Sequence, residues 1–121
     1  MKEDNLVADK SKAFAVRIIR LYQHLAQGKQ EFVLSKQVLR SGTSIGANVK
    51  EALRAQSKAD FTAKMQIALK EASETEYWLE LLIETEYIDE KAGKSILADC
   101  RELIKLITAI VKTSKVNQTK N

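Results

Sequence analysis

Not one proline interrupts the 121 residues of this sequence, and only four glycines do. Proline and glycine are the residues that most often end helices and strands, so a chain with so few of them runs in long, uninterrupted elements. A sheet of short strands needs turn-forming residues at regular intervals and is hard to build here. The sequence therefore predicts an all-α protein of long helices.

Apolar residues recur at helical spacing in four segments. The first, from about residue 8 to 27, ends at Gly28, and the second begins with Ser35 as its cap and fades near residues 56 and 57. The third ends at residues 87–89, where Asp89 can cap the fourth. The four stripes are Phe14, Ile18, Leu21 and Leu25; Val38, Ile45, Val49 and Ala52; Phe61, Met65, Ala68, Ala72, Leu79 and Leu82; and Ile96, Cys100, Leu103, Ile107 and Ile110.

Four helices joined by short loops predict an antiparallel up-down-up-down four-helix bundle, because a short connection makes consecutive helices antiparallel. We expect the bundle to occupy residues 1–115. Residues 116–121 are polar and basic and have no apolar period, so we expect a frayed tail there. A chain of this length forms one domain.

Few side chains here suit metal or redox chemistry. Cys100 is the only cysteine, which excludes an intramolecular disulfide and a zinc site of several thiolates, and we expect it to be a small buried side chain. His24 is the only histidine, which excludes a bundle di-iron site, and we give it no role. We expect no metal, no cofactor and, without an apolar segment of membrane length or a signal peptide, a cytoplasmic protein.

The second helical segment carries a polar ridge beside its apolar stripe. The ridge consists of Gln37, Arg40, Ser44, Asn48 and Glu51 at steps of three, four, four and three. Serine and asparagine are weak helix formers and are unusual on a plain solvated face, although such a face is the alternative. We interpret the ridge as a contact surface.

Arg40 is the strongest member of the ridge, because a guanidinium can hold a carboxylate through two hydrogen bonds. The third segment offers Glu71, Glu74 and Glu76 as partners, and the sequence leaves open which one pairs and in which subunit. We expect Arg40 to be largely buried, with Asn48 and Glu51 extending the contact to a neighbouring helix or subunit. If so, Arg40→Ala should unfold or disassemble the protein.

Charge is unevenly distributed along the chain. Residues 1–60 carry 11 Lys/Arg against 6 Asp/Glu, whereas residues 71–90 carry eight acids and no Lys or Arg. Basic helix faces bind phosphates without reading sequence. The candidate nucleic-acid contacts are Arg17, Arg20, Lys36, Lys50, Arg54, Lys112 and Lys115, with solvated charge as the alternative.

The run Ser35–Ala52, SKQVLRSGTSIGANVKEA, resembles the bacterial four-helix-bundle proteins encoded in intervening sequences of large-subunit ribosomal RNA genes. Its specific part is the ridge pattern, joined to Ala68, Glu71 and residues 74–79 of the third segment. Proline is common in the family where Gly46 stands, and glycine where Ala52 stands. The accessory variability determinant of diversity-generating retroelements is more distantly similar.

The resemblance implies a homopentamer, and the distant relative implies a basic surface for nucleic acid. The leading hypothesis is a non-enzymatic homo-oligomeric scaffold or adaptor whose basic surface meets RNA, DNA or a nucleic-acid enzyme. The alternative is a purely structural homo-oligomer with no nucleic-acid role. A hydrolase using the acids of the third segment is a remote third reading, because acids along a helix without a cleft, histidine or metal motif usually serve solubility or ion pairing.

Overall fold

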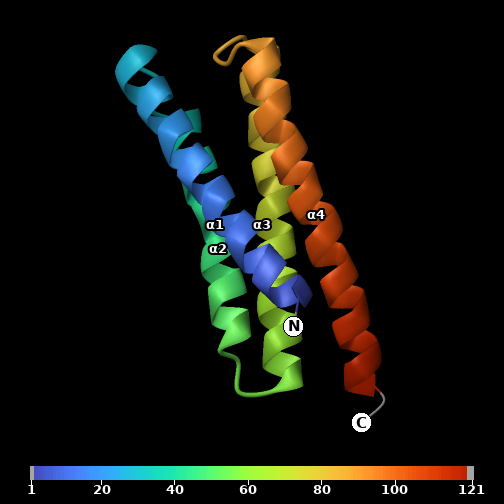
Figure 1. The fold of residues 1–121 in the computed structure, drawn as a ribbon. Coiled ribbons are helices and arrows are strands. Elements are labelled where there is room, and N and C mark those ends of the chain that lie inside the picture. The colour runs from blue at the N-terminus through green and yellow to red at the C-terminus, as the bar shows by residue number, and fades with distance from the viewer. Residues whose placement is uncertain (1, 120–121) are drawn as a thin grey trace.

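A computed structural model describes residues 2–119 of the chain. It contains four long helices, α1 (Lys2–Gln23), α2 (Leu34–Leu53), α3 (Lys58–Glu84) and α4 (Glu90–Thr119). A short π-helical segment, η1 (His24–Gly28), continues α1 to its end. The described residues contain no strand. Figure 1 shows the helices side by side, running alternately up and down, so the predicted all-α four-helix bundle is confirmed.

Contacts between helices show that neighbours are antiparallel. Arg17 of α1 reaches Asp99 of α4, and Lys10, earlier in α1, reaches the later Glu102. The same inverse order holds between α3 and α4, where Thr62 bonds Ser114 and Glu76 bonds Arg101. Each helix therefore packs against two neighbours around one central core.

The core consists of the apolar stripes that the spacing predicts. Seventeen of the nineteen stripe residues are buried, and the exceptions, Leu21 and Phe61, are partly buried and pack against the core. The stripe residues in this core are Phe14, Ile18, Leu25, Val38, Ile45, Val49, Ala52, Met65, Ala68, Ala72, Leu79, Leu82, Ile96, Cys100, Leu103, Ile107 and Ile110. Val7, Ile88, Leu97 and Val111 complete it. Helical periodicity therefore identifies 17 of the 21 core residues.

Two predicted boundaries differ from the structure. The first helix begins at Lys2 and not near residue 8, because Val7 lies seven residues before Phe14 and extends the buried stripe by two turns. The fourth helix continues to Thr119, so residues 116–119 of the expected tail are helical. Residues 120 and 121 lie outside the described part of the chain.

The start of α2 is capped by Glu31 and not by Ser35. The Glu31 carboxylate accepts hydrogen bonds from the backbone N–H groups of Val33, Leu34 and Ser35, at 3.1, 3.0 and 2.7 Å. Ser35 lies inside the first turn, where its hydroxyl donates to the Glu31 carbonyl at 2.7 Å. One carboxylate thus satisfies three of the N–H groups that a helix start leaves without partners. The predicted cap at Asp89 is confirmed by its bond to the Ala92 N–H at 3.2 Å.

The glycines of α2 let α1 approach closely. A methyl group placed on Gly42 would lie 2.7 Å from Ile18 Cγ1, and one on Gly46 would lie 3.3 Å from the Ser11 carbonyl oxygen. These two glycines, four residues apart, therefore serve the contact with α1, and the polar ridge faces the other way, toward α3.

Candidate functional site

Arg40 joins α2 to α3 within one chain. Its Nη1 donates to both carboxylate oxygens of Glu71, at 3.3 and 3.2 Å, and its Nη2 bonds Glu74. We call this group the Arg40 clamp. The predicted pairing with an α3 carboxylate is confirmed, and the partners are two glutamates of the same chain, one turn apart.

Trp78 extends the clamp along α3. Its indole Nε1 donates to Glu74 at 2.9 Å, so this carboxylate accepts from two donors on two helices. The Trp78 hydrogen bond and the Arg40 guanidinium together lower the pKa of Glu74 below its ordinary value, against a smaller opposite effect of burial. The hydrogen bond from Arg40 to Glu74 raises the pKa of Arg40. Arg40 and Glu74 therefore remain an ion pair at neutral pH.

The expected burial of Arg40 is wrong for the single chain, where its side chain is 49% exposed. The reason is geometric. Each helical residue advances about 100° around the axis, so Arg40, two residues after the buried Val38, points about 200° away from it. Glu71 and Glu74 are more enclosed, at 17% and 33% exposure. The guanidinium covers these carboxylates from the outside.

Two of the other ridge residues reach less far than expected. Ser44 donates to the Arg40 carbonyl at 2.6 Å and Asn48 to the Ser44 carbonyl at 2.9 Å, so both bond their own helix. The expectation that Asn48 reaches a neighbouring helix is not met within the chain. Glu51 does reach α3, through Lys64 at 3.1 Å. Gln37 is exposed at the far end of the ridge.

A buried polar contact lies beneath the ridge. The hydroxyls of Ser41 and Thr75 are hydrogen-bonded at 2.9 Å, and both residues are fully buried. This pair was not predicted, because serine and threonine in helices resemble surface residues. Helical spacing could have revealed that Thr75 is buried, since it lies three residues after the core residue Ala72.

A second arginine clamp joins α4 to α3, and it was not predicted. Arg101 donates from Nε to Glu76 at 2.9 Å and from Nη2 to Glu80 at 3.2 Å. Glu76 and Glu80 lie four residues apart and thus on one face, which is the signal that could have revealed the pair. Arg40 and Arg101 therefore hold α3 from opposite sides, and together they pair with four of the eight acids in residues 71–90.

The predicted nucleic-acid contacts do not form one cluster. Arg17 pairs with Asp99 at 2.6 Å and also donates to Ser95 at 3.3 Å, which ties it to the seam between α1 and α4. The other six side chains are exposed and have no ion-pair partner among residues 2–119. They lie on three helices: Arg20 on α1; Lys36 and Lys50 on α2, with Arg54 at its C-terminal cap; and Lys112 and Lys115 on α4.

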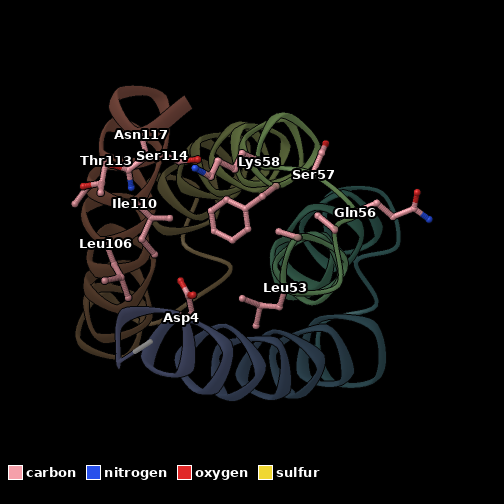
Figure 2. A pocket seen from close by; sticks show the side chains of 14 residues that line it. Asp4, Leu53, Gln56, Ser57, Lys58, Leu106, Ile110, Thr113, Ser114 and Asn117 are labelled. Atoms are coloured by element: carbon pink, nitrogen blue, oxygen red, sulfur yellow. The ribbon is translucent and has the colours of Figure 1, made fainter. Parts of the chain in front are cut away.

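A pocket of about 740 Å³ opens at the end of the bundle where α1 begins and α4 ends. Figure 2 shows Leu53 across the opening from Ile110 and Leu106, with Asp4 between them. Apolar side chains form most of its wall, and of its 14 lining residues only Asp4 and Lys58 carry ionisable side chains. The other polar residues of the wall are Gln56, Ser57, Thr113, Ser114 and Asn117.

The single cysteine and the single histidine lie in different surroundings. Cys100 is buried in the core, its Sγ 3.3 Å from the Ala72 carbonyl, and burial, helped by the nearby Glu76 charge, raises its pKa to about 12. A thiol with this pKa is a poor nucleophile. His24 is exposed on η1. Within residues 2–119, no three His, Cys, Asp or Glu side chains come together as a metal site would require.

None of the helices in the described part of the chain combines the length and the apolar character of a membrane span.

Comparison with known proteins supports the resemblance seen in the sequence. Residues 3–109 match the family of the 23S rRNA-intervening sequence protein. The chain is also similar to a solved structure from Bacteroides thetaiotaomicron, described as a protein of unknown function from the S23 ribosomal protein family. The two sequences are 61% identical, the alignment covers 91% of this chain and 98% of the other, and the TM-score is 0.89. No curated protein matches. The chain therefore belongs to the 23S rRNA-intervening sequence protein family.

Proposed function

We propose that this protein is a non-enzymatic, homo-oligomeric scaffold of the cytoplasm that binds the phosphate backbone of RNA or DNA. The observation that carries this proposal is the outward face of α2. Positions at alternating steps of four and three form a row of Lys36, Arg40, Thr43, Ala47, Lys50 and Arg54. We call it the α2 row.

Four of the six residues in the α2 row are cationic, and only Arg40 has an ion-pair partner among the described residues. The row points away from the buried stripe of the same helix, so its lysines and its terminal arginine face solvent. Unpaired cations aligned on a helix attract phosphates and release the counterions bound to them. This supports a surface that recognises charge and not sequence.

Apolar side chains on the surface support the homo-oligomer. Val16 and Ile19 of α1 are 50% and 42% exposed, and Ile67 and Tyr77 of α3 are 42% and 55% exposed. Aliphatic and aromatic side chains at this exposure stabilise a complex when a second copy covers them. The family resemblance favours a pentamer.

Binding measured against salt tests the nucleic-acid proposal. Wild-type protein should retain duplex and single-stranded probes at about 50 mM salt and lose them steeply as salt rises, because log affinity falls linearly with log salt. The triple variant Lys36→Gln, Lys50→Gln, Arg54→Gln should bind more weakly, with a shallower salt slope. Absence of any retention by wild-type protein at low salt would refute the proposal.

The second candidate is a purely structural homo-oligomer without a nucleic-acid role. The exposed apolar side chains favour it independently of the cations, because they predict association between copies and nothing further. The same experiment separates the two candidates. A stable oligomer that retains no probe at any salt concentration would establish the structural role.

A further inference from the structure

A second row of cations runs along α4. The row comprises Lys91, Lys94, Ala98, Arg101, Lys105, Thr108, Lys112 and Lys115 at alternating steps of three and four, so all eight positions share one helical face. Every one of these residues is exposed, and six of the eight are cationic. We call it the α4 row. At about 1.5 Å per residue it extends for about 36 Å.

Most of the charge on the α4 row is free to meet a ligand. Arg101 is held by Glu76 and Glu80, and Lys94 pairs with Glu90 at 3.0 Å, with both of these side chains exposed. The remaining cations, Lys91, Lys105, Lys112 and Lys115, have no ion-pair partner among residues 2–119. From residue 103 to 119 the helix contains no acid, so its C-terminal half is uniformly basic.

The acids of α4 beyond its first residue lie outside the row, on the side that faces α1. Asp99 pairs with Arg17 at 2.6 Å, and Glu102 pairs with Lys10 at 2.8 Å. Because α1 neutralises these two carboxylates, they oppose the positive charge of the row less than free acids would.

The middle of the row is hollow. A shallow groove of about 660 Å³ lies over Ala98, whose short side chain leaves room between its longer neighbours. Lys94, Arg101 and Lys105 line it, together with Leu97 and Glu102. Lys94 and Arg101 are already paired with acids, so Lys105 is the cation of this groove that has no ion-pair partner among residues 2–119, and the groove adds space beside it for a phosphate group.

We propose that the α4 row is a second phosphate-binding surface, which takes the backbone of a nucleic-acid duplex. This inference rests on the proposed function and adds a face that it does not use. The α2 and α4 rows are separate, because α1 and α3 lie between those two helices. The protein thus offers backbone contacts on two sides of one bundle.

The length of the α4 row and the composition of α4 favour a duplex as the ligand. The row of about 36 Å matches one turn of a double helix, which is about 34–36 Å. Proteins that hold single strands supply aromatic side chains on which bases stack, and α4 contains no aromatic residue from Glu90 to Thr119. A duplex keeps its bases stacked inside and presents phosphates alone, which is what lysines can bind.

Three triple variants of equal charge test the inference on the full chain. Lys105→Gln, Lys112→Gln and Lys115→Gln remove charge from the α4 row. Lys36→Gln, Lys50→Gln and Arg54→Gln remove it from the α2 row. Lys12→Gln, Lys29→Gln and Lys70→Gln remove it from exposed positions on neither row and serve as the control. All are surface changes, and circular dichroism and sizing chromatography check that fold and assembly are kept.

The readout is the affinity for RNA and DNA duplexes of about 20 base pairs, and for the matching single strands, from low to high salt. The α4 variant should lose duplex affinity relative to the control, and its salt slope should be shallower by about 2.7, at about 0.9 for each of three lost contacts. The two rows should contribute separately, so combining their variants should weaken binding more than either does alone.

Four results would overturn the inference, and they can be told apart. An α4 variant that binds like the control, while the α2 variant is weakened, removes the α4 surface and leaves the proposed function intact. Wild-type protein that binds no probe refutes both. A change in oligomer mass for the α4 variant alone would show that the row contacts another copy of the chain and not a duplex. A clear preference of the wild type for single strands would refute the duplex.

Discussion

At the scale of single residues, the arginines decide how α3 is held. Arg40 and Arg101 come from the helices on either side, and each bonds two α3 glutamates spaced by one turn. Both guanidinium groups stay partly in water, at 49% and 54% exposure. Their cost of desolvation is therefore small, and so is the stabilisation that each ion pair can supply.

Arg40→Ala should lower the free energy of unfolding by about 1–2 kcal/mol. This lies between the 0–1 kcal/mol of an exposed ion pair and the 3–5 kcal/mol of a buried one, because Glu71 and Glu74 are more enclosed than Arg40 and would lose their shared partner. Urea melts measure the change. Arg54→Ala is the control, since Arg54 is exposed just beyond α2 and has no ion pair among the described residues. Equal losses in both variants would contradict a structural role for the Arg40 clamp.

Gly42→Ala should destabilise the contact between α1 and α2. The new methyl group would lie 2.7 and 2.8 Å from Ile18 Cγ1 and Cγ2, atoms close to the backbone of a β-branched side chain with little freedom to move. Overpacking of this kind costs about 1–3 kcal/mol, against a gain of about 1 kcal/mol in helix propensity. Thermal melts should show a net loss. Gly28→Ala, whose methyl group meets ordinary contacts at 3.6 Å, should be neutral or stabilising.

At the scale of helices, the ends are set by side chains that reach across several residues. Glu31 is the clearest example. Burial alone would raise the pKa of this carboxyl, but the bonds from the backbone N–H groups of Leu34, Ser35 and Val33 outweigh it, and the pKa lies below its ordinary value of 4.5. The ionised carboxylate thus belongs to the folded state of α2, as anions do at helix N-termini.

Stability should therefore fall in acid. The stabilisation from a lowered carboxyl pKa is complete above the unfolded value of about 4.5 and is lost as pH falls through the lower, folded value. Glu74 adds an effect of the same sign. Glu31→Gln should cost about 0.5–2 kcal/mol at neutral pH and should flatten the decline below pH 4.5. Chemical denaturation at a series of pH values measures both. An unchanged pH profile in the variant would show that Glu31 is not the group responsible.

The helices and core could be predicted from the sequence, because burial imposes a local period on apolar residues. The side chains that pair across two helices could not be predicted in this way. The period places Arg40 and Arg101 on their helices, but the register between helices decides which α3 acids they meet. Ser35 suggested a helix start because serine is a common cap, whereas the cap is a longer carboxylate four residues earlier. Lys112 and Lys115 of the α4 row were predicted as candidate contacts, but the row itself, with Lys91, Lys94 and Lys105, was missed because the period was sought among apolar residues alone.

At the scale of the whole molecule, paired acids and unpaired lysines lie in different places. The α3 acids that pair with arginine lie in the seams, whereas unpaired lysines lie along the outer faces of α2 and α4. The run of eight acids is thus partly neutralised within the chain, and its capacity to attract a second copy is reduced. We therefore expect association between copies to depend more on the exposed apolar side chains than on charge.

Light scattering should show an oligomer, and its mass should change little between low and high salt. Apolar contacts are not weakened by screening, whereas ion pairs between copies would be. Replacing Ile67 and Tyr77 with polar residues should lower the mass if α3 lies in the interface, with Lys12→Gln as an exposed control on α1. A monomeric mass for the wild type at micromolar concentration and moderate salt would contradict the oligomer.

The Arg40 clamp also gives the protein an intrinsic optical reporter. Trp78 is the only tryptophan in the chain, and it is half-buried in the seam between α2 and α3, with its indole nitrogen bonded to Glu74. Indole emission depends on local polarity and hydrogen bonding. Any event that opens this seam, whether acid, a variant or a bound partner, should therefore shift the fluorescence of the unlabelled protein, and the signal will come from one known position.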